Sequence, residues 1–182
     1  HSMVHIPLFA SDEFRGSSAR GLYGDTVMEI DAGVGEIVRT LKDQGIAENT
    51  MIVFTSDNGP WLIFDQHGGS AGLLREGKGT TWEGGMREPT IFWMPGKIKP
   101  DVVHDMGSTL DIFATACAMT GATLPEDRKM DSYDLSPVLF EGKPSPRNEM
   151  FFYRGSELYA ARVGAYKAHY ITEDVYVRET NR

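Results

Sequence analysis

The sequence predicts an α/β fold, and three features support this prediction. Apolar residues recur at steps of three and four from Tyr23 to Gln44, which is typical of an amphipathic helix. Two short runs rich in β-forming residues follow at 51–55 and 90–94. Their unbroken apolar character is typical of strands buried in a parallel sheet. A helix, a short loop and a buried strand in succession is the expected pattern of an α/β protein.

The helix at 23–44 has a clear end, because Gly45 follows the apolar pattern and Lys42 lies in the last turn. Gly33 and Gly35 interrupt the pattern, and we expect close packing there. Between the two strands, residues 58–87 contain eight glycines and little periodicity. A loop of this length inside a compact domain usually has a function.

After the second strand, the pattern predicts a helix from His104 to Thr120, ended by Gly121, and one helical turn at 135–139. Short β-rich runs at 150–153, 158–162 and 166–170 predict strands, with a turn at 163–165. We therefore expect an α/β domain over residues 1–146 and a small antiparallel β subdomain over residues 147–182.

Composition restricts the classes of function and partner that the sequence allows. The 182 residues are 41% hydrophobic and 24% charged, and the net charge of -8 argues against a nucleic-acid partner or a polybasic membrane patch. No apolar run approaches the roughly 20 residues of a transmembrane helix. The single cysteine excludes an internal disulfide. The N-terminus does not resemble a signal peptide, and we expect that the sequence begins within a longer protein.

Asp57 and Asn58 follow the first predicted strand directly, in Thr55-Ser56-Asp57-Asn58-Gly59. In open α/β sheets, ligands bind at the carboxyl ends of strands. A carboxylate and an amide oxygen there suit Ca²⁺ or Mg²⁺, and Gly59 would let the backbone turn away from the ion. Since Asn-Gly is also a strong turn dipeptide, these residues alone favour a simple turn.

Three basic side chains are further candidates. Lys78 stands between Gly77 and Gly79, where it can offer a compact positive charge to an anion, although a solvated lysine is the commoner case. His5 lies beside apolar residues and a proline, and it is either a hydrogen-bonded structural histidine or a proton donor and anion ligand. His67, before Gly68-Gly69, has the same two interpretations. The histidine spacing does not fit a zinc site.

Together the segments VHIPLFAS, RGLYGDTVMEIDAGVGEIV, IVFTSDNGP, GGSAGLLREGKGTTWEGGMREP, WMPGKI, FFYRG and YKAHY resemble the formylglycine-dependent sulfatases. The resemblance is to the branch that includes arylsulfatase A and N-acetylgalactosamine-6-sulfatase. The segments cover nearly the whole chain in the family's order, and GKGTTWEGGMREP is the most specific. The resemblance implies the C-terminal part of an alkaline-phosphatase-like domain, which is a mostly parallel sheet flanked by helices.

The resemblance also implies roles. Asp57 and Asn58 resemble two ligands of the family's divalent cation, usually calcium. Lys78 and His5 resemble the residues that contact the substrate sulfate, and His5 can also protonate the leaving oxygen. His67 would line the substrate pocket. In this family a formylglycine attacks sulfur, while the cation, lysine and histidine neutralise growing negative charge.

The chain departs from the family at the nucleophile, because no C/S-x-P-x-R motif occurs in it, and it lacks the paired N-terminal aspartates that complete the metal site. We therefore expect no sulfatase turnover from these 182 residues alone. Because strands of the sheet would be missing, we also expect association with the missing N-terminal part or self-association.

Two alternatives to a sulfatase are a phosphate or phosphonate ester hydrolase of the same superfamily and a non-catalytic, truncated module. The substrate would be a small-molecule or glycan sulfate ester. One cysteine and no glycosylation sequon favour a bacterial periplasmic or secreted enzyme over a lysosomal one.

Overall fold

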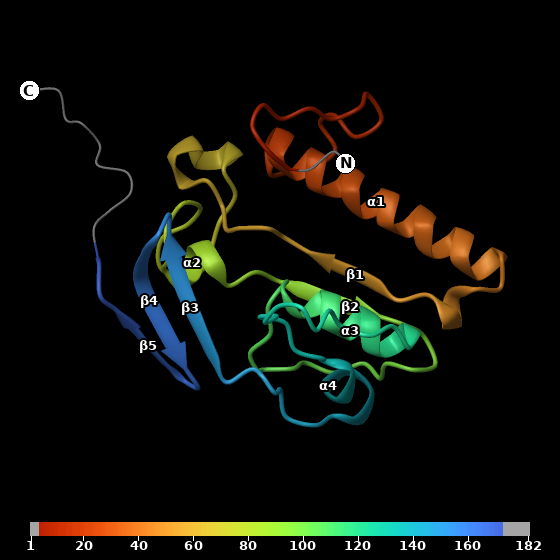
Figure 1. The fold of residues 1–182 in the computed structure, drawn as a ribbon. Helices are drawn as coiled ribbons and strands as arrows, with labels where there is room; N and C mark the ends of the chain where they lie inside the picture. Colours follow the sequence, from red (N-terminus) through yellow and green to blue (C-terminus); the bar gives the residue numbers. More distant parts are fainter. Residues whose placement is uncertain (1–3, 173–182) are drawn as a thin grey trace, which may run out of the picture. The chain divides into compact units, whose positions relative to one another are not determined.

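The structure is a computed structural model that describes residues 4–172, and these residues form two compact units (Figure 1). The first unit consists of the described residues up to Met94, and the second begins at Pro95. The boundary expected near residue 147 lies inside the second unit, and the division into 1–146 and 147–182 stays a prediction. Residues 173–182 of the expected β subdomain lie outside the described residues.

The first unit contains the predicted long helix and both predicted strands. Its elements are α1 (Gly21–Asp43), η1 (Ala47–Asn49), β1 (Ile52–Thr55), η2 (Leu62–His67), α2 (Glu83–Met86) and β2 (Thr90–Trp93). Gly45 takes a positive φ of 68° just beyond α1, and the Ile46 amide donates to the carbonyl of Leu41, so the glycine ends the helix as expected. No helix in residues 4–172 is long and apolar enough to cross a membrane.

Strands β1 and β2 pair antiparallel, with Ile52 opposite Trp93 and Thr55 opposite Thr90. The parallel arrangement expected of these two strands is therefore wrong for this pair. Apolar runs indicate burial, but they do not fix strand direction. Here the direction follows from the connecting loop, which folds back on itself: the Gly59 amide donates to the carbonyl of Gly85 at 3.2 Å. Strand β2 consequently starts beside the end of β1.

The apolar surfaces of the first unit are only partly covered. Phe54 is 43% exposed, Ile91 60% and Ile37 55%. A Cβ added to Gly33 or Gly35 would meet nothing within 4 Å, so the close packing expected at these glycines is wrong. The reason is that the described residues of this unit supply no second layer over these parts of the helix and sheet.

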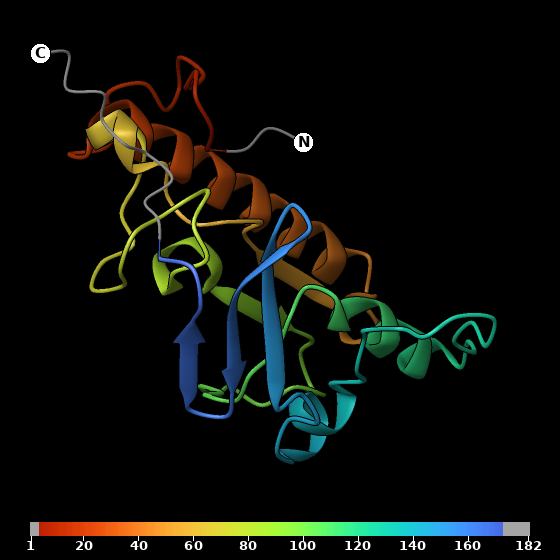
Figure 2. The ribbon, with the colours of Figure 1, turned by 60° about the vertical axis from the view of Figure 1, so that its left-hand side comes forward.

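The second unit holds α3 (Asp111–Thr120), α4 (Ser136–Glu141) and a sheet of β3 (Glu149–Arg154), β4 (Glu157–Val163) and β5 (Tyr166–His169). The strands lie in the order β3-β4-β5 and both pairs are antiparallel, as predicted (Figure 2). The helix expected from His104 begins only at Asp111. The Asp111 carboxylate accepts a hydrogen bond from the Ser108 amide at 2.8 Å and so holds residues 108–110 in a turn before the helix.

A buried ion pair joins distant parts of the second unit. The guanidinium of Arg147 donates to both carboxylate oxygens of Asp111, from Nε at 2.8 Å and from Nη2 at 2.6 Å. The Asp111 side chain is fully buried and that of Arg147 nearly so. The hydrogen bond with Asp111 raises the pKa of Arg147 above its ordinary value. The start of α3 is thereby tied to the segment that enters β3.

Candidate anion and cation site

The candidate site lies on the glycine-rich loop between β1 and β2, where two stretches of backbone are in close contact. A Cβ at Gly59 would overlap the carbonyl oxygen of Gly84, so only glycine fits. Gly59 does not have a positive φ, and the expected turn away from an ion is therefore not the reason for this glycine. Its role is to let the Asp57–Pro60 segment lie directly against residues 84–85.

A second contact brings Lys78 to the same segment. The amide of Lys78 donates to the carbonyl of Pro60 at 2.8 Å, and a Cβ at Gly77 would overlap that same carbonyl oxygen. Gly77 is therefore needed for the approach. As a result the backbone of Lys78 is fixed to a residue only two positions after Asn58.

Lys78 and His5 meet although they are 73 positions apart in the sequence. The ammonium Nζ of Lys78 lies 2.9 Å from Nε2 of His5. The other ring nitrogen, Nδ1, lies 2.8 Å from the carbonyl oxygen of Ile6. Since a carbonyl can only accept, the hydrogen bonds assign the proton to Nδ1 and leave Nε2 to accept from the ammonium. The structure thus joins the two residues for which a sulfate-binding role was expected.

The segment that carries His5 is fastened to α1 by two acidic side chains. The Ser11 amide donates to Oε2 of Glu29 at 2.9 Å. The amides of Gly16 and Ser18 each donate to the Asp25 carboxylate at 2.8 Å. These amides lower the pKa of Asp25 below its ordinary value, the Gly16 bond most strongly. Sequence patterns do not reveal this role, because the partners are backbone amides earlier in the chain.

Trp61 is a site residue that the sequence analysis missed. Its ring centroid lies 5.5 Å from that of His5, and the ammonium of Lys78 lies 4.9 Å from its centre. Phe64 packs edge-on against the indole at 4.7 Å. The only signal in the sequence is that Trp61, a large aromatic residue, directly follows the Asp57–Pro60 segment.

Asp57 and Asn58 have the donor atoms that a hard divalent cation prefers. The Asp57 side chain is exposed and accepts no hydrogen bond from the described residues. The amide nitrogen of Asn58 donates to the carbonyl of Gly59 at 3.2 Å, which leaves its carbonyl oxygen available. Two such oxygens fit a calcium ion but fill only part of its six to eight positions. No group of three or more His, Cys, Asp or Glu in residues 4–172 could hold a metal.

His67, the remaining candidate, ends η2 and is exposed. Its side chain makes no hydrogen bond or ion pair with any residue that the structure describes. The contacts that join His5, Trp61 and Lys78 do not include it, and its role in a substrate pocket stays a prediction.

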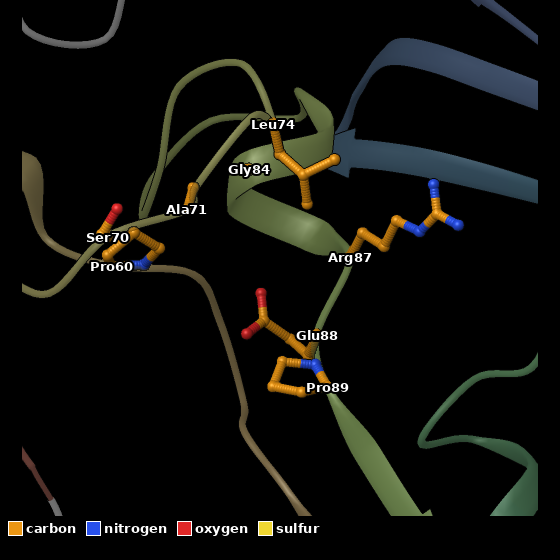
Figure 3. A pocket seen from close by; sticks show the side chains of 8 residues that line it. All are labelled: Pro60, Ser70, Ala71, Leu74, Gly84, Arg87, Glu88 and Pro89. Carbon is orange, nitrogen blue, oxygen red and sulfur yellow. The ribbon is translucent and has the colours of Figure 1, made fainter. Parts of the chain in front are cut away.

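A small cavity of about 130 Å³ lies next to this loop, with Pro60, Ser70 and Glu88 among its lining residues (Figure 3). The carboxylate of Glu88 points toward Pro60, while Arg87 points away from it (Figure 3). Burial raises the pKa of Glu88, and the negative charge of Asp57 raises it further. The carboxylate oxygen Oε1 is buried and has no hydrogen-bond partner among the described residues. The described residues therefore give the charged form of Glu88 no hydrogen bond at this oxygen.

Comparison with known proteins assigns the family. The sulfatase family model matches residues 2–122, and the model for the C-terminal region of aryl-sulfatase matches residues 145–182. The chain belongs to the sulfatase family. This membership confirms the resemblance seen in GKGTTWEGGMREP and the other segments.

Individual relatives agree with the expected branch. The chain is 45% identical to arylsulfatase A of Homo sapiens over 177 residues, covering 93% of this chain and 34% of that protein. It is 49% identical to N-acetylgalactosamine-6-sulfatase of Sus scrofa over 171 residues, covering 93% of this chain and 33% of that protein. The chain therefore spans about a third of the length of these relatives.

Among solved structures, the chain is similar to PsFucS1 sulfatase from Pseudoalteromonas sp., with a TM-score of 0.83 and 33% identity. The match covers 91% of this chain and 34% of that one. This similarity confirms the expected fold class, the C-terminal part of an alkaline-phosphatase-like sulfatase domain, in which the described strands form small antiparallel sheets.

Proposed function

We propose that the complete protein hydrolyses a sulfate ester and that His5 and Lys78 bind the sulfate group. The observation that carries the proposal is the 2.9 Å contact between Lys78 Nζ and His5 Nε2. This contact brings together side-chain nitrogens of two residues that both lie in segments resembling the sulfatases. An anion that enters between them gives the Lys78 ammonium an oxygen to donate to in place of Nε2, and Nε2 of His5 can donate to the anion once it carries a proton.

The chemistry of these side chains suits a sulfate ester. Lys78 offers a positive charge to the sulfate oxygens, whose negative charge grows as the sulfur–oxygen bond breaks. His5 holds a proton on Nδ1 against the Ile6 carbonyl. Once Lys78 turns to the sulfate, Nε2 of His5 is free to carry a second proton and to deliver it to the departing oxygen.

Asp57 and Asn58 would supply two oxygen ligands to a divalent cation, most simply calcium. When bound, such a cation supplies further positive charge next to the sulfate oxygens. The close backbone contacts of Gly59 and Gly77 support this joint role, because they hold the Asp57–Pro60 segment and Lys78 together. The other cation ligands and the formylglycine nucleophile would come from residues outside this chain.

The substrate class that we propose is a small-molecule or glycan sulfate ester. The names of the relatives support it, since they include an arylsulfatase and a sulfatase of a sulfated amino sugar. For the location of the protein we propose the periplasm or the extracellular space of a bacterium, because the sequence has one cysteine and no glycosylation sequon.

The partly exposed apolar surfaces support the expected association. Phe54, Ile37 and Ile91 would be covered by the rest of the sulfatase domain in the complete protein, and by a second copy in its absence. Size-exclusion chromatography of the 182-residue chain tests this expectation. A compact monomer would contradict it.

A panel of nitrophenyl esters tests the proposed activity. The complete protein should hydrolyse the sulfate ester faster than the matched phosphate and phosphonate esters, and a chelator should abolish the rate until calcium is restored. The 182-residue chain alone should give no rate above buffer. Faster phosphate or phosphonate hydrolysis would favour the other esterase class, and no hydrolysis of any ester would favour a non-catalytic module.

A further inference from the structure

We propose that Trp61 is a positioning residue of this anion site: its indole holds the Lys78 ammonium and the His5 ring so that both face one sulfate. The inference rests on the proposed function of His5 and Lys78. It adds to that function a residue that acts through them and takes no part in the chemistry.

The backbone of Trp61 is held firmly on both sides. Its amide donates to the carbonyl of Gly68 at 2.9 Å, and a Cβ at Gly68 would overlap the carbonyl oxygen of Trp61. The edge of the indole is fixed by Phe64, at 4.7 Å between ring centroids and an angle of 70°. The indole is therefore held through its backbone and by Phe64, in the loop that directly follows Asp57 and Asn58.

Both basic side chains lie against this surface. The Lys78 ammonium is 4.9 Å from the indole centre, within the range of a cation–π attraction. The His5 ring is tilted by 48° to the indole at 5.5 Å. Since His5 and Lys78 come from segments 73 residues apart, a shared surface is an effective way to bring their nitrogens to 2.9 Å.

An aromatic partner has an advantage over a carboxylate at this position. Lys78 forms no ion pair with any residue in the described part of the chain. A carboxylate beside Lys78 would neutralise its charge and compete with the substrate sulfate. The indole attracts the ammonium and leaves its net charge available to an anion.

The indole N–H, unpaired among the described residues, indicates that Trp61 has a role besides stabilising the fold. Nε1 is buried, and no described residue accepts a hydrogen bond from it. A buried donor without a partner destabilises the folded protein. Phenylalanine would keep an aromatic face and remove this donor. A purely structural role would thus be filled at least as well by a phenylalanine side chain as by tryptophan, so the two roles predict different results for Trp61→Phe.

The test measures the affinity of inorganic sulfate for the complete protein by calorimetry. The midpoint of thermal unfolding is measured for the same variants. Trp61→Leu, which keeps apolar bulk but has no aromatic face, should bind sulfate about two- to fivefold more weakly. Trp61→Phe should show a smaller loss of affinity with no fall in the midpoint. Trp93→Phe, a tryptophan of β2 outside the site, should leave sulfate affinity unchanged.

A second readout follows the His5 ring directly. Nitrogen-15 NMR of the imidazoles should show the His5 proton on Nδ1 in the sulfate-free protein, and Trp61→Leu should shift the tautomer ratio because Lys78 is no longer held at Nε2. Unchanged sulfate affinity and unchanged tautomer in both Trp61 variants would overturn the inference. If Lys78→Ala also left sulfate affinity unchanged, the proposed function itself would fail.

Discussion

The buried pair of Asp111 and Arg147 allows a quantitative prediction for Asp111→Asn. Asp111 accepts four hydrogen bonds: two from Arg147, at 2.6 and 2.8 Å, one from the Ser108 amide at 2.8 Å and one from the Tyr133 amide at 2.9 Å. Asparagine has a single side-chain acceptor oxygen. Whichever way its amide is turned, the NH₂ group faces one nitrogen of Arg147 and one backbone amide, so two of the four contacts become donor against donor.

The loss also leaves the Arg147 charge poorly compensated. The nearest other carboxylate is that of Asp131, at 3.4 Å from Nη1, and it is 71% exposed. Removal of one partner from a buried ion pair costs about 3–5 kcal/mol. For a unit of this size each kcal/mol lowers the thermal midpoint by about 4–8 °C, so we expect a fall of at least about 12 °C.

Thermal and urea unfolding followed by circular dichroism measures this loss. Asp127→Asn is the matched control, because it breaks an exposed ion pair with Arg128 in the same unit and should change little. Asp111→Leu combined with Arg147→Met should recover much of the stability, since no buried charge remains. If Asp111→Asn behaved like Asp127→Asn, the ion pair would not hold this unit together.

Three further predictions concern the first unit. The folded-state pKa of Asp25 is lowered, so its stabilisation is present above the unfolded-state pKa of about 3.8 and is lost as pH falls through the folded-state pKa. The urea midpoint of Asp25→Asn should thus be lower than wild type at pH 7, and the gap should shrink in acid; a gap independent of pH would refute this. The folded-state pKa of Glu88 is raised from 4.5, so stability is lost as pH rises through it, and Glu88→Gln should raise the midpoint at pH 7 but not at pH 4. An equal effect at both pH values would count against an ionised, half-buried Glu88. Gly59→Ala should cost about 1–3 kcal/mol, because the new methyl group overlaps the backbone of residue 84, whereas Gly33→Ala, in open space on α1, should be neutral or stabilising. Equal midpoints for the two alanine variants would contradict the close contact.

Local sequence patterns predicted the helices and strands well where one periodicity dominated. The run from Tyr23 to Gln44 became α1 with nearly the expected ends, and the three C-terminal strands lie where their apolar runs indicated. The pattern failed at His104, because apolar residues before Asp111 continued the helical spacing while the Asp111 carboxylate held Ser108 in a turn. A capping interaction of this kind depends on geometry that spacing alone does not contain.

The candidate site was predictable in part. Motif resemblance identified His5, Lys78, Asp57 and Asn58, and the structure joins the first two directly. Trp61 belongs to no motif, and its importance follows only from the three-dimensional meeting of segments 4–6, 61–64 and 78. The same holds for the glycine contacts, since close approach of two backbones leaves no trace in either stretch of sequence alone.

The measurement that tests the central claim most directly is kcat/KM for an aryl sulfate, compared between wild type and Lys78→Ala of the complete protein. If Lys78 stabilises the charge of the reacting sulfate, kcat/KM should fall by about 10²–10³-fold. Lys97→Ala, an exposed lysine of the second unit, should match wild type. A Lys78→Ala enzyme with wild-type kcat/KM would contradict the assignment of this lysine, and with it the proposed sulfate site.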